Sequence, residues 1–199
     1  MRRLRSLACS LLLAALLGGC SRDPSAGAPG APGAPACAPC EQAQVVSPVL
    51  LAFLSKARAA HHKADLSLEA GDRAGAIRAL EPVVAGAAPP GGLPEVAEVA
   101  ADTRARLADL RSEEGDFDGA LRDVEAGLAL APGPSHFRGH LVEVRGVVEE
   151  RRARALAEKG DSEAAERARK AAMAAFEEAI AIQDEVIAKA LEEARETPR

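Results

Sequence analysis

Two cysteines separated by two residues, in CAPC at 37–40, have the type and spacing to do chemistry. Such a pair can form a local disulfide, exchange thiols with a partner, or supply half of a four-ligand zinc site. A thioredoxin-type site needs a preceding strand, and the Pro- and Gly-rich stretch before Cys37 predicts none. A c-type haem site needs His after the second cysteine, where this chain has Glu41. We expect a disulfide between Cys37 and Cys40, with thiol or metal chemistry and an intermolecular crosslink as the alternatives.

The histidines are the other candidate metal ligands. His136 and His140 lie one helical turn apart, a spacing that presents two imidazoles to one ion. No glutamate follows in the arrangement of a helical metalloprotease, and the sequence groups no further ligands with them. His61 or His62 could complete a zinc site only together with the cysteines. We therefore predict no bound metal and no cofactor.

Other catalytic patterns are missing from the sequence. It contains no Gly-rich phosphate loop, no nucleophile elbow and no pair of carboxylates carried on predicted strands. Aromatic residues make up 2% of the chain, which disfavours binding by base or sugar stacking. We predict that the protein is not an enzyme.

Residues 1–19 have the pattern of a secretory signal. Three arginines precede an apolar run at 11–17 that is too short to span a membrane. The end of this segment, LLGGC at 16–20, resembles the lipobox of bacterial lipoproteins. The resemblance implies cleavage before Cys20 and a lipid anchor on that residue. Because Ser21 stands where an acidic retention signal would be, it also implies the outer membrane, facing the periplasm, in a cell with two membranes. The alternative is an ordinary signal peptide whose cysteine is incidental.

Residues 20–46 would join this anchor to the rest of the chain. Repeated Ala, Pro and Gly at 21–36 predict a flexible or polyproline-like tether. Removal of residues 1–19 takes away three arginines and no carboxylate, so the net charge falls from −5 to −8. That balance disfavours nucleic acid and anionic lipid surfaces as partners.

Residues 47–199 are predicted to form an all-α domain. Alanine is abundant, and from Ser47 onward apolar residues recur at steps of three and four, which is typical of helices. We expect three antiparallel helical hairpins, at about 47–86, 93–131 and 135–196.

A Gly-Asp dipeptide marks the turn of each expected hairpin. Glycine can take the left-handed conformation that ends a helix, and aspartate can cap the N-terminus of the next. The three dipeptides are Gly71-Asp72, Gly115-Asp116 and Gly160-Asp161. An alanine lies seven residues before each glycine and another lies five residues after it, giving Ala64, Ala108, Ala153, Ala76, Ala120 and Ala165. Small residues at both places predict a close approach of the two helices in each hairpin.

The stretch from about residue 57 to 182 resembles the tetratricopeptide repeat family. The second hairpin matches best, through Leu107, Ala108, Gly115, Asp116, Phe117, Ala120, Ala126, Leu128 and Pro132. The turn glycines are 44 and 45 residues apart, however, against about 34 in the family. Arg104 and Arg111 also replace large apolar residues expected in the first helix. The resemblance implies an α-solenoid that binds peptides in a groove formed by the first helix of each hairpin.

On this chain the implied groove carries mixed charge. Its candidate residues are Arg58, His61, Asp65, Asp102, Asp109, Glu150 and Arg154. Such a mixture suits a peptide or a protein surface better than an apolar small molecule. Simple solvent exposure of these residues is the alternative interpretation.

The last expected helix runs from Ser162 to about Glu196. An apolar stripe follows one face of it, formed by Met173, Phe176, Ile180, Ile187 and Leu191 and interrupted by Asp184. We expect its first half to pack on the preceding helix and the remainder to cap the array. Self-association of this helix, or a coiled coil with a partner, is the alternative.

Together these features predict a lipid-anchored scaffold of the cell envelope that binds other proteins through helical hairpins. Relatives with this plan assist envelope assembly or secretion, which the resemblance extends to this chain. Two alternatives stay open. One is a thiol-redox or metal-handling lipoprotein centred on Cys37 and Cys40, and the other is a structural spacer without a specific partner.

Overall fold

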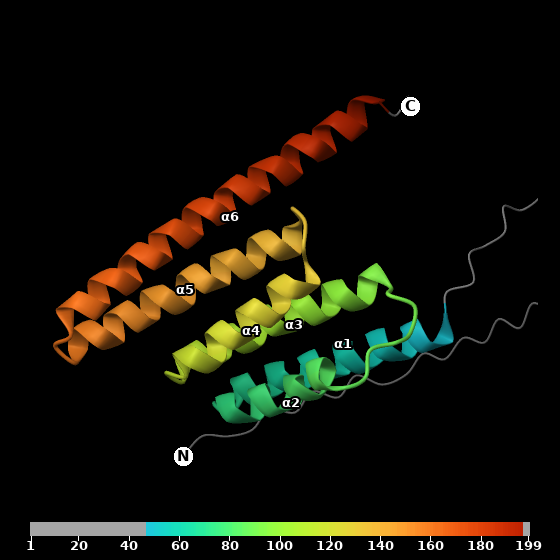
Figure 1. Ribbon diagram of the computed structural model, residues 1–199. Helices are drawn as coiled ribbons and strands as arrows, with labels where there is room; N and C mark the ends of the chain where they lie inside the picture. The colour runs from blue at the N-terminus through green and yellow to red at the C-terminus, as the bar shows by residue number, and fades with distance from the viewer. Residues whose placement is uncertain (1–46, 197–199) are drawn as a thin grey trace, which may run out of the picture. The chain divides into compact units, whose positions relative to one another are not determined.

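Six helices and their connections make up residues 47–196, the part of the chain that the computed structural model describes (Figure 1). These residues contain no strand, which confirms the all-α prediction for this part of the chain. The helices are α1 (Pro48–Glu69), α2 (Arg73–Ala85), α3 (Pro94–Glu113), α4 (Phe117–Leu130), α5 (His136–Glu158) and α6 (Ser162–Glu196). The predicted signal at 1–19, the lipidation site Cys20 and the pair Cys37 and Cys40 lie outside the described residues.

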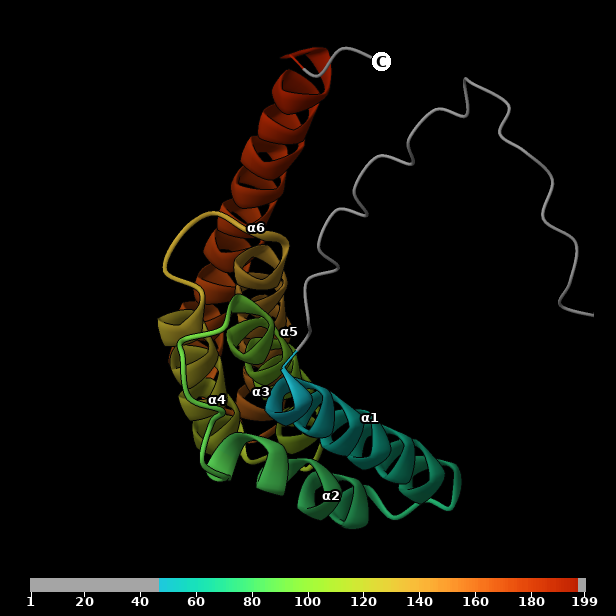
Figure 2. The same ribbon diagram turned by 90° about the vertical axis from the view of Figure 1, so that its right-hand side faces the viewer.

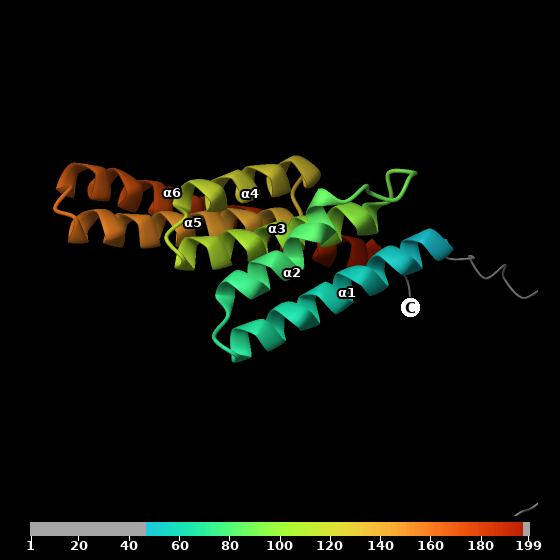
Figure 3. The same cartoon turned by 90° about the horizontal axis from the view of Figure 1, so that it is seen from below.

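Consecutive helices pack as three pairs, α1 with α2, α3 with α4 and α5 with α6 (Figures 1 and 3). α3 also contacts α1, α2 and α5, and α4 contacts α5, so the pairs lie side by side. α1 and α6 lie at opposite ends of this row (Figure 2). Among the described helices, none is both long enough and apolar enough to cross a membrane.

The three Gly-Asp dipeptides form the turns as predicted. Each glycine has a positive φ that side chains with a Cβ rarely adopt, 77° at Gly71, 83° at Gly115 and 80° at Gly160. Each following aspartate caps the next helix by accepting a backbone N–H bond, at 2.7, 2.9 and 3.0 Å. The backbone N–H of the same aspartate closes the previous helix by donating to a carbonyl five residues back. Two residues therefore end one helix and begin the next.

The six alanines that flank these turns are buried. Ala64, Ala76, Ala108 and Ala120 are 0% exposed, and Ala153 and Ala165 are 3% exposed. At these positions a methyl group separates the two helices of a pair, which permits their close approach. The sequence-based prediction for these positions is confirmed.

α6 packs on α5 through a row of alanines rather than through the larger residues of the predicted stripe. The row alternates steps of three and four residues and comprises Ala165, Ala168, Ala172, Ala175 and Ala179. Met173, Ile180, Ile187 and Leu191 are instead 56–63% exposed. Phe176 alone of the predicted stripe packs inward, against Gly146 of α5. The first half of α6 thus packs on α5 as expected, but four of the five residues of the predicted stripe face solvent.

The contact between Gly146 and Phe176 generates a test of this close packing. A Cβ at position 146 would lie 2.7 Å from the Phe176 ring, closer than van der Waals contact allows. Gly146→Ala should therefore lower the free energy of unfolding by about 1–2 kcal/mol, even though alanine favours a helix interior. Urea denaturation measures the change. Phe176→Leu should relieve the clash, so the double variant should be more stable than the two single changes predict, and simple additivity would contradict the contact.

Candidate interaction groove

A cleft of about 400 Å³ lies where the first helices of the three pairs, α1, α3 and α5, come together. It is lined by His61, Asp102, Ala105, Arg106, Asp109, His140, Glu143, Val144 and Val147. The α3 residues share one helix face because they are spaced by three and four positions. Buried Ala105 and Val144 give the cleft an apolar floor, and charged side chains surround it. Three of the predicted groove residues, His61, Asp102 and Asp109, therefore line one cleft.

The other four predicted groove residues lie outside this cleft. Arg58 is exposed on α1, and Asp65 is bound by Arg106 at the edge. Glu150 and Arg154 form an ion pair of 2.8 Å along α5. Arg154 also lines a second, open cavity of about 510 Å³ beside the hairpin turns.

A chain of hydrogen bonds fixes His61 and joins α1 to α3. The Thr103 hydroxyl donates to the Val99 carbonyl at 2.7 Å, so its oxygen is left to accept from His61 Nε2 at 3.0 Å. Arg106 donates to His61 Nδ1 at 3.1 Å and to the Asp65 carboxylate. Both neighbours of the ring therefore require the neutral imidazole with its proton on Nε2.

The same surroundings shift two pKa values. Burial, followed by the Arg106 charge, lowers the pKa of His61 below its ordinary 6.5. The hydrogen bond from Arg106 lowers the pKa of Asp65 below its ordinary 3.8. Arg106 therefore acts on both groups in the same direction, since its charge disfavours imidazolium and favours carboxylate. Arg106 was not predicted from the sequence, although it lies one turn from Asp102 and Asp109 on the predicted groove helix.

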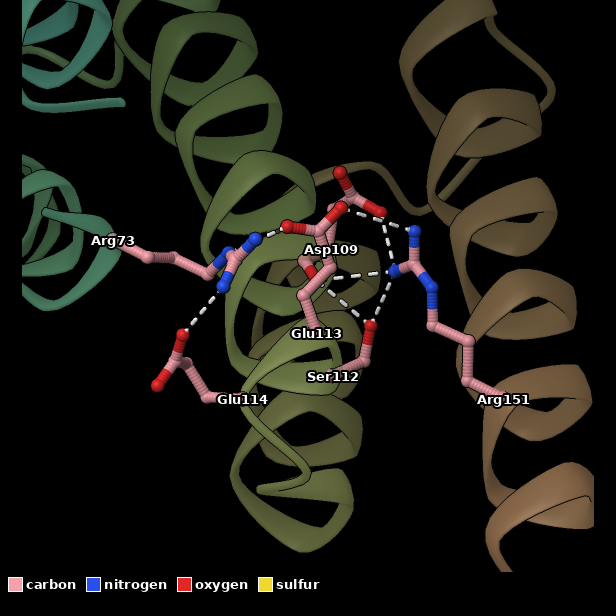
Figure 4. A network of polar contacts seen from close by, with 6 residues as sticks. All are labelled: Arg73, Asp109, Ser112, Glu113, Glu114 and Arg151. Carbon is pink, nitrogen blue, oxygen red and sulfur yellow. Dashed lines mark hydrogen bonds and ion pairs between the residues drawn. The ribbon is translucent and has the colours of Figure 1, made fainter. Parts of the chain in front are cut away.

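Asp109 is held by a polar network that crosses all three helix pairs (Figure 4). Arg151 of α5 donates to Asp109 Oδ1 at 2.7 Å and to Ser112 Oγ at 2.6 Å. Arg73 of α2 donates to Glu113 at 2.7 Å and to Glu114 at 2.8 Å, and these carboxylates raise the pKa of its guanidinium. Asp109 is thus engaged in holding α5 against α3.

Asp102 differs from the other charged residues of the cleft. Glu143 lies 3.6 Å from His140, and Arg106 and Asp109 are both bonded as described above. Within residues 47–196, Asp102 makes no hydrogen bond or ion pair. Its carboxylate is the charged group of the cleft most available to a ligand.

Behind the groove, a buried aspartate explains two unusual arginines. Asp123 of α4 has a side chain only 1% exposed, and it accepts hydrogen bonds from Arg104, at 2.5 Å, and from Arg111. Arg111 also donates to Glu81 of α2 at 2.8 Å. The two arginines that replace apolar residues of the tetratricopeptide pattern therefore have a carboxylate partner. An aspartate inside the otherwise apolar face of α4 was the signal in the sequence that could have revealed it.

Within residues 47–196, the histidines of α5 are not grouped with further metal ligands. The rings of His136 and His140 stack in parallel, with centroids 6.4 Å apart. No group of three or more His, Cys, Asp or Glu residues in the described part of the chain is placed to hold a metal ion. Cys37 and Cys40, which the alternative zinc site requires, lie outside that part.

Comparisons with protein family models, with curated proteins and with solved structures gave no match to this chain.

Substitution of Asp123 tests whether the buried ion network stabilises the fold. Asp123→Ala leaves two partly buried guanidinium groups facing each other without their carboxylate. We expect a loss of about 2–3 kcal/mol in the free energy of unfolding, near the lower limit for a broken buried ion pair because both arginines retain contact with water. Chemical denaturation measures it. Glu125→Ala, an exposed change on the same helix, is the control and should alter stability by less than about 0.5 kcal/mol.

Titration of His61 tests the hydrogen-bond chain between α1 and α3. Folding disfavours protonation of His61, so stability conferred by the neutral ring is present above about pH 6.5 and is lost as the pH falls through the lowered pKa. Arg106→Gln should raise the pKa of His61, because it removes a neighbouring positive charge. It should also raise the pKa of Asp65. NMR titration of the imidazole resonances measures the pKa of His61. Lys63→Gln is the control variant and should leave this pKa unchanged. An unchanged His61 pKa in Arg106→Gln would contradict the contact between Arg106 and His61.

Proposed function

We propose that this protein is a lipid-anchored scaffold of the cell envelope that binds a segment of a partner protein in the groove formed by α1, α3 and α5. The observation that carries the proposal is the cleft of about 400 Å³ to which all three first helices contribute. Its apolar floor and charged border have the composition of a protein-binding surface. Side chains from three helix pairs can contact one extended or helical segment along its length.

The three helix pairs, in this proposal, form a tetratricopeptide-like array. Three features support it: the repeated Gly-Asp turn, the repeated buried alanines, and the position of the cleft on the first helix of each pair. The array would differ from the family in its longer interval between repeats. Ion pairs would also replace part of the usual apolar contact between helices, as Asp123 does with Arg104 and Arg111.

The chemistry of the groove favours a partner segment with a basic residue beside a small apolar one. Asp102 is available to an arginine or lysine of the partner, since Arg106 and Asp109 are already bonded and Glu143 lies beside His140. Ala105, Val144 and Val147 offer apolar contact next to it. An acidic segment would meet three carboxylates in the cleft, those of Asp102, Asp109 and Glu143.

The location of the scaffold follows from the predicted signal and lipobox. Cleavage before Cys20 and its acylation would anchor the protein to a membrane, and residues 20–46 would connect the helices to the anchor. In a cell with two membranes we place it at the outer membrane, facing the periplasm. Loss of palmitate labelling in Cys20→Ala tests the anchor separately from the groove.

Site-specific photo-crosslinking in the producing cell tests the groove. A photoreactive amino acid at position 102 should give a discrete crosslinked product, whereas the same residue at position 125, exposed on α4, should not. Val147→Glu, which adds a charge to the apolar wall, should reduce the yield at position 102 at least about tenfold. Glu125→Lys is the control and should leave that yield unchanged. Equal crosslinking at positions 102 and 125, or no effect of Val147→Glu, would contradict the proposed binding site.

A further inference from the structure

The outer face of α1 is open at positions that are covered in α3. The two helices can be aligned on their turn glycines, Gly71 for α1 and Gly115 for α3. The α3 residues that lie 19, 16, 12, 8 and 5 positions before Gly115 are Val96, Val99, Thr103, Leu107 and Leu110. Four of these five are buried, and Leu107 and Leu110 pack against the preceding pair. The corresponding α1 residues are Ala52, Ser55, Ala59, Lys63 and Leu66, and all five are exposed. α1 therefore presents a helix face of the type that accepts another helix, with small residues in the middle.

The outer face of α6 is open in the same sense at the other end of the row. Met173 lies 13 residues after the turn glycine Gly160. The residues at the same place in the second helices of the other pairs are Val84 of α2 and Leu128 of α4. Val84 packs against an apolar cluster that includes residues of α3, and Leu128 against one that includes residues of α5. Met173, Ile180 and Ile187 are spaced by seven residues and are 56–63% exposed. A seven-residue spacing of large apolar side chains is the pattern of a helix that packs along another helix.

We propose that α6 of one copy of this chain packs antiparallel on α1 of a second copy. On α1, Ala52, Ala59 and Leu66 also recur every seven residues. With Ile180 placed opposite Ala59, Ile187 meets Ala52, and at the other end Met173 meets the exposed side chain of Leu66. Two layers thus pair a large side chain with a small one, and the third pairs two large apolar side chains, all at the same seven-residue spacing.

The charges agree with the same register. Glu177 and Asp184 lie four residues after Met173 and Ile180, and Lys56 and Lys63 lie four residues after Ala52 and Ala59. In the antiparallel register these charged residues lie on the same side of the helix–helix contact. Glu177 is then opposite Lys63, and Asp184 is opposite Lys56. Within residues 47–196, Lys63, Glu177 and Asp184 have no hydrogen-bond or ion-pair partner, and Lys56 donates only to the Pro82 carbonyl, at 3.1 Å.

The overall charge of the two segments favours this partner over a symmetric pair of α6 helices. Residues 176–196 carry seven carboxylates and two cations, whereas α1 carries three cations and two carboxylates. A symmetric antiparallel α6 pair centred on Ile180 and Ala181 would place Glu177 of each copy beside Asp184 of the other. Like charges at that distance oppose association.

Because the interface joins α6 of one copy to α1 of another, a dimer still has an unoccupied α1 face at one end and an unoccupied α6 face at the other. Such head-to-tail contacts do not close on themselves in a dimer, so assembly continues with concentration. The proposal goes beyond the binding groove and does not depend on it, because the groove residues of α3 and α5 take no part.

Two variants that each block one face test the proposal in the purified full-length chain. Sedimentation velocity of the parent should show a mass that rises with concentration. Ile180→Glu, which blocks α6, and Ala59→Glu, which blocks α1, should each weaken association at least about thirtyfold. An equimolar mixture of the two should form a heterodimer and nothing larger, because each variant keeps one intact face.

Several outcomes would overturn this arrangement. A parent that stays monomeric at all concentrations excludes self-association, and a self-associating Ala59→Glu indicates the symmetric α6 pair instead. Both substitutions are at exposed positions, and circular dichroism with thermal denaturation verifies that each variant is folded.

Charge reversal provides a second test of the register. Lys63→Glu and Glu177→Lys should each weaken association about tenfold, and the double variant should recover most of the parent affinity. A double variant that associates no better than either single variant would exclude the proposed pairing of these residues.

Discussion

The close approach of paired helices is the constraint on which this structure depends. With 2% aromatic residues, the chain cannot fill wide gaps between helices, so backbones must come together where alanine or glycine is placed. Ala64, Ala108 and Ala153 meet this need in the three first helices, and the row of alanines on α6 extends it along the last pair. The Gly-Asp turn serves the same end, because a connection of two residues leaves the helices no room to separate.

Contacts through alanine bury little apolar surface, so polar networks act together with apolar contacts such as those of Leu107 and Leu110 to hold one pair on the next. Asp123 binds two arginines of α3, one of which also reaches α2 through Glu81. On the other side of α3, Arg151 of α5 binds Asp109. A buried ion pair contributes little net stability compared with apolar residues, but it allows few alternative arrangements of its partners. These networks therefore fix the relative positions of the first helices, and with them the shape of the groove.

The sequence was sufficient for features that depend on neighbouring residues. The helix ends at each Gly-Asp dipeptide, the buried alanines beside them and the extent of α6 follow from local rules of capping and spacing. Features that depend on distant residues were not accessible. Arg104 and Arg111 looked like defects in a repeat because their partner, Asp123, lies on another helix. On α6, side-chain size pointed to Met173 and Ile180 as the packed face, whereas close approach selects the smaller alanines.

The groove and the end of the row share one element, α1. Among the described helices, α1 contacts only α2 and α3, and its side-chain hydrogen bonds to α3 are made by Asp65 and by His61. The ring of His61 must be neutral to accept from Arg106 and donate to Thr103. Protonation of His61 would place a second cation beside Arg106 and remove the acceptor on Nδ1. Protonation would therefore weaken one of the two side-chain links between α1 and α3 and would change the α1 side of the cleft, because His61 is the α1 contribution to the lining.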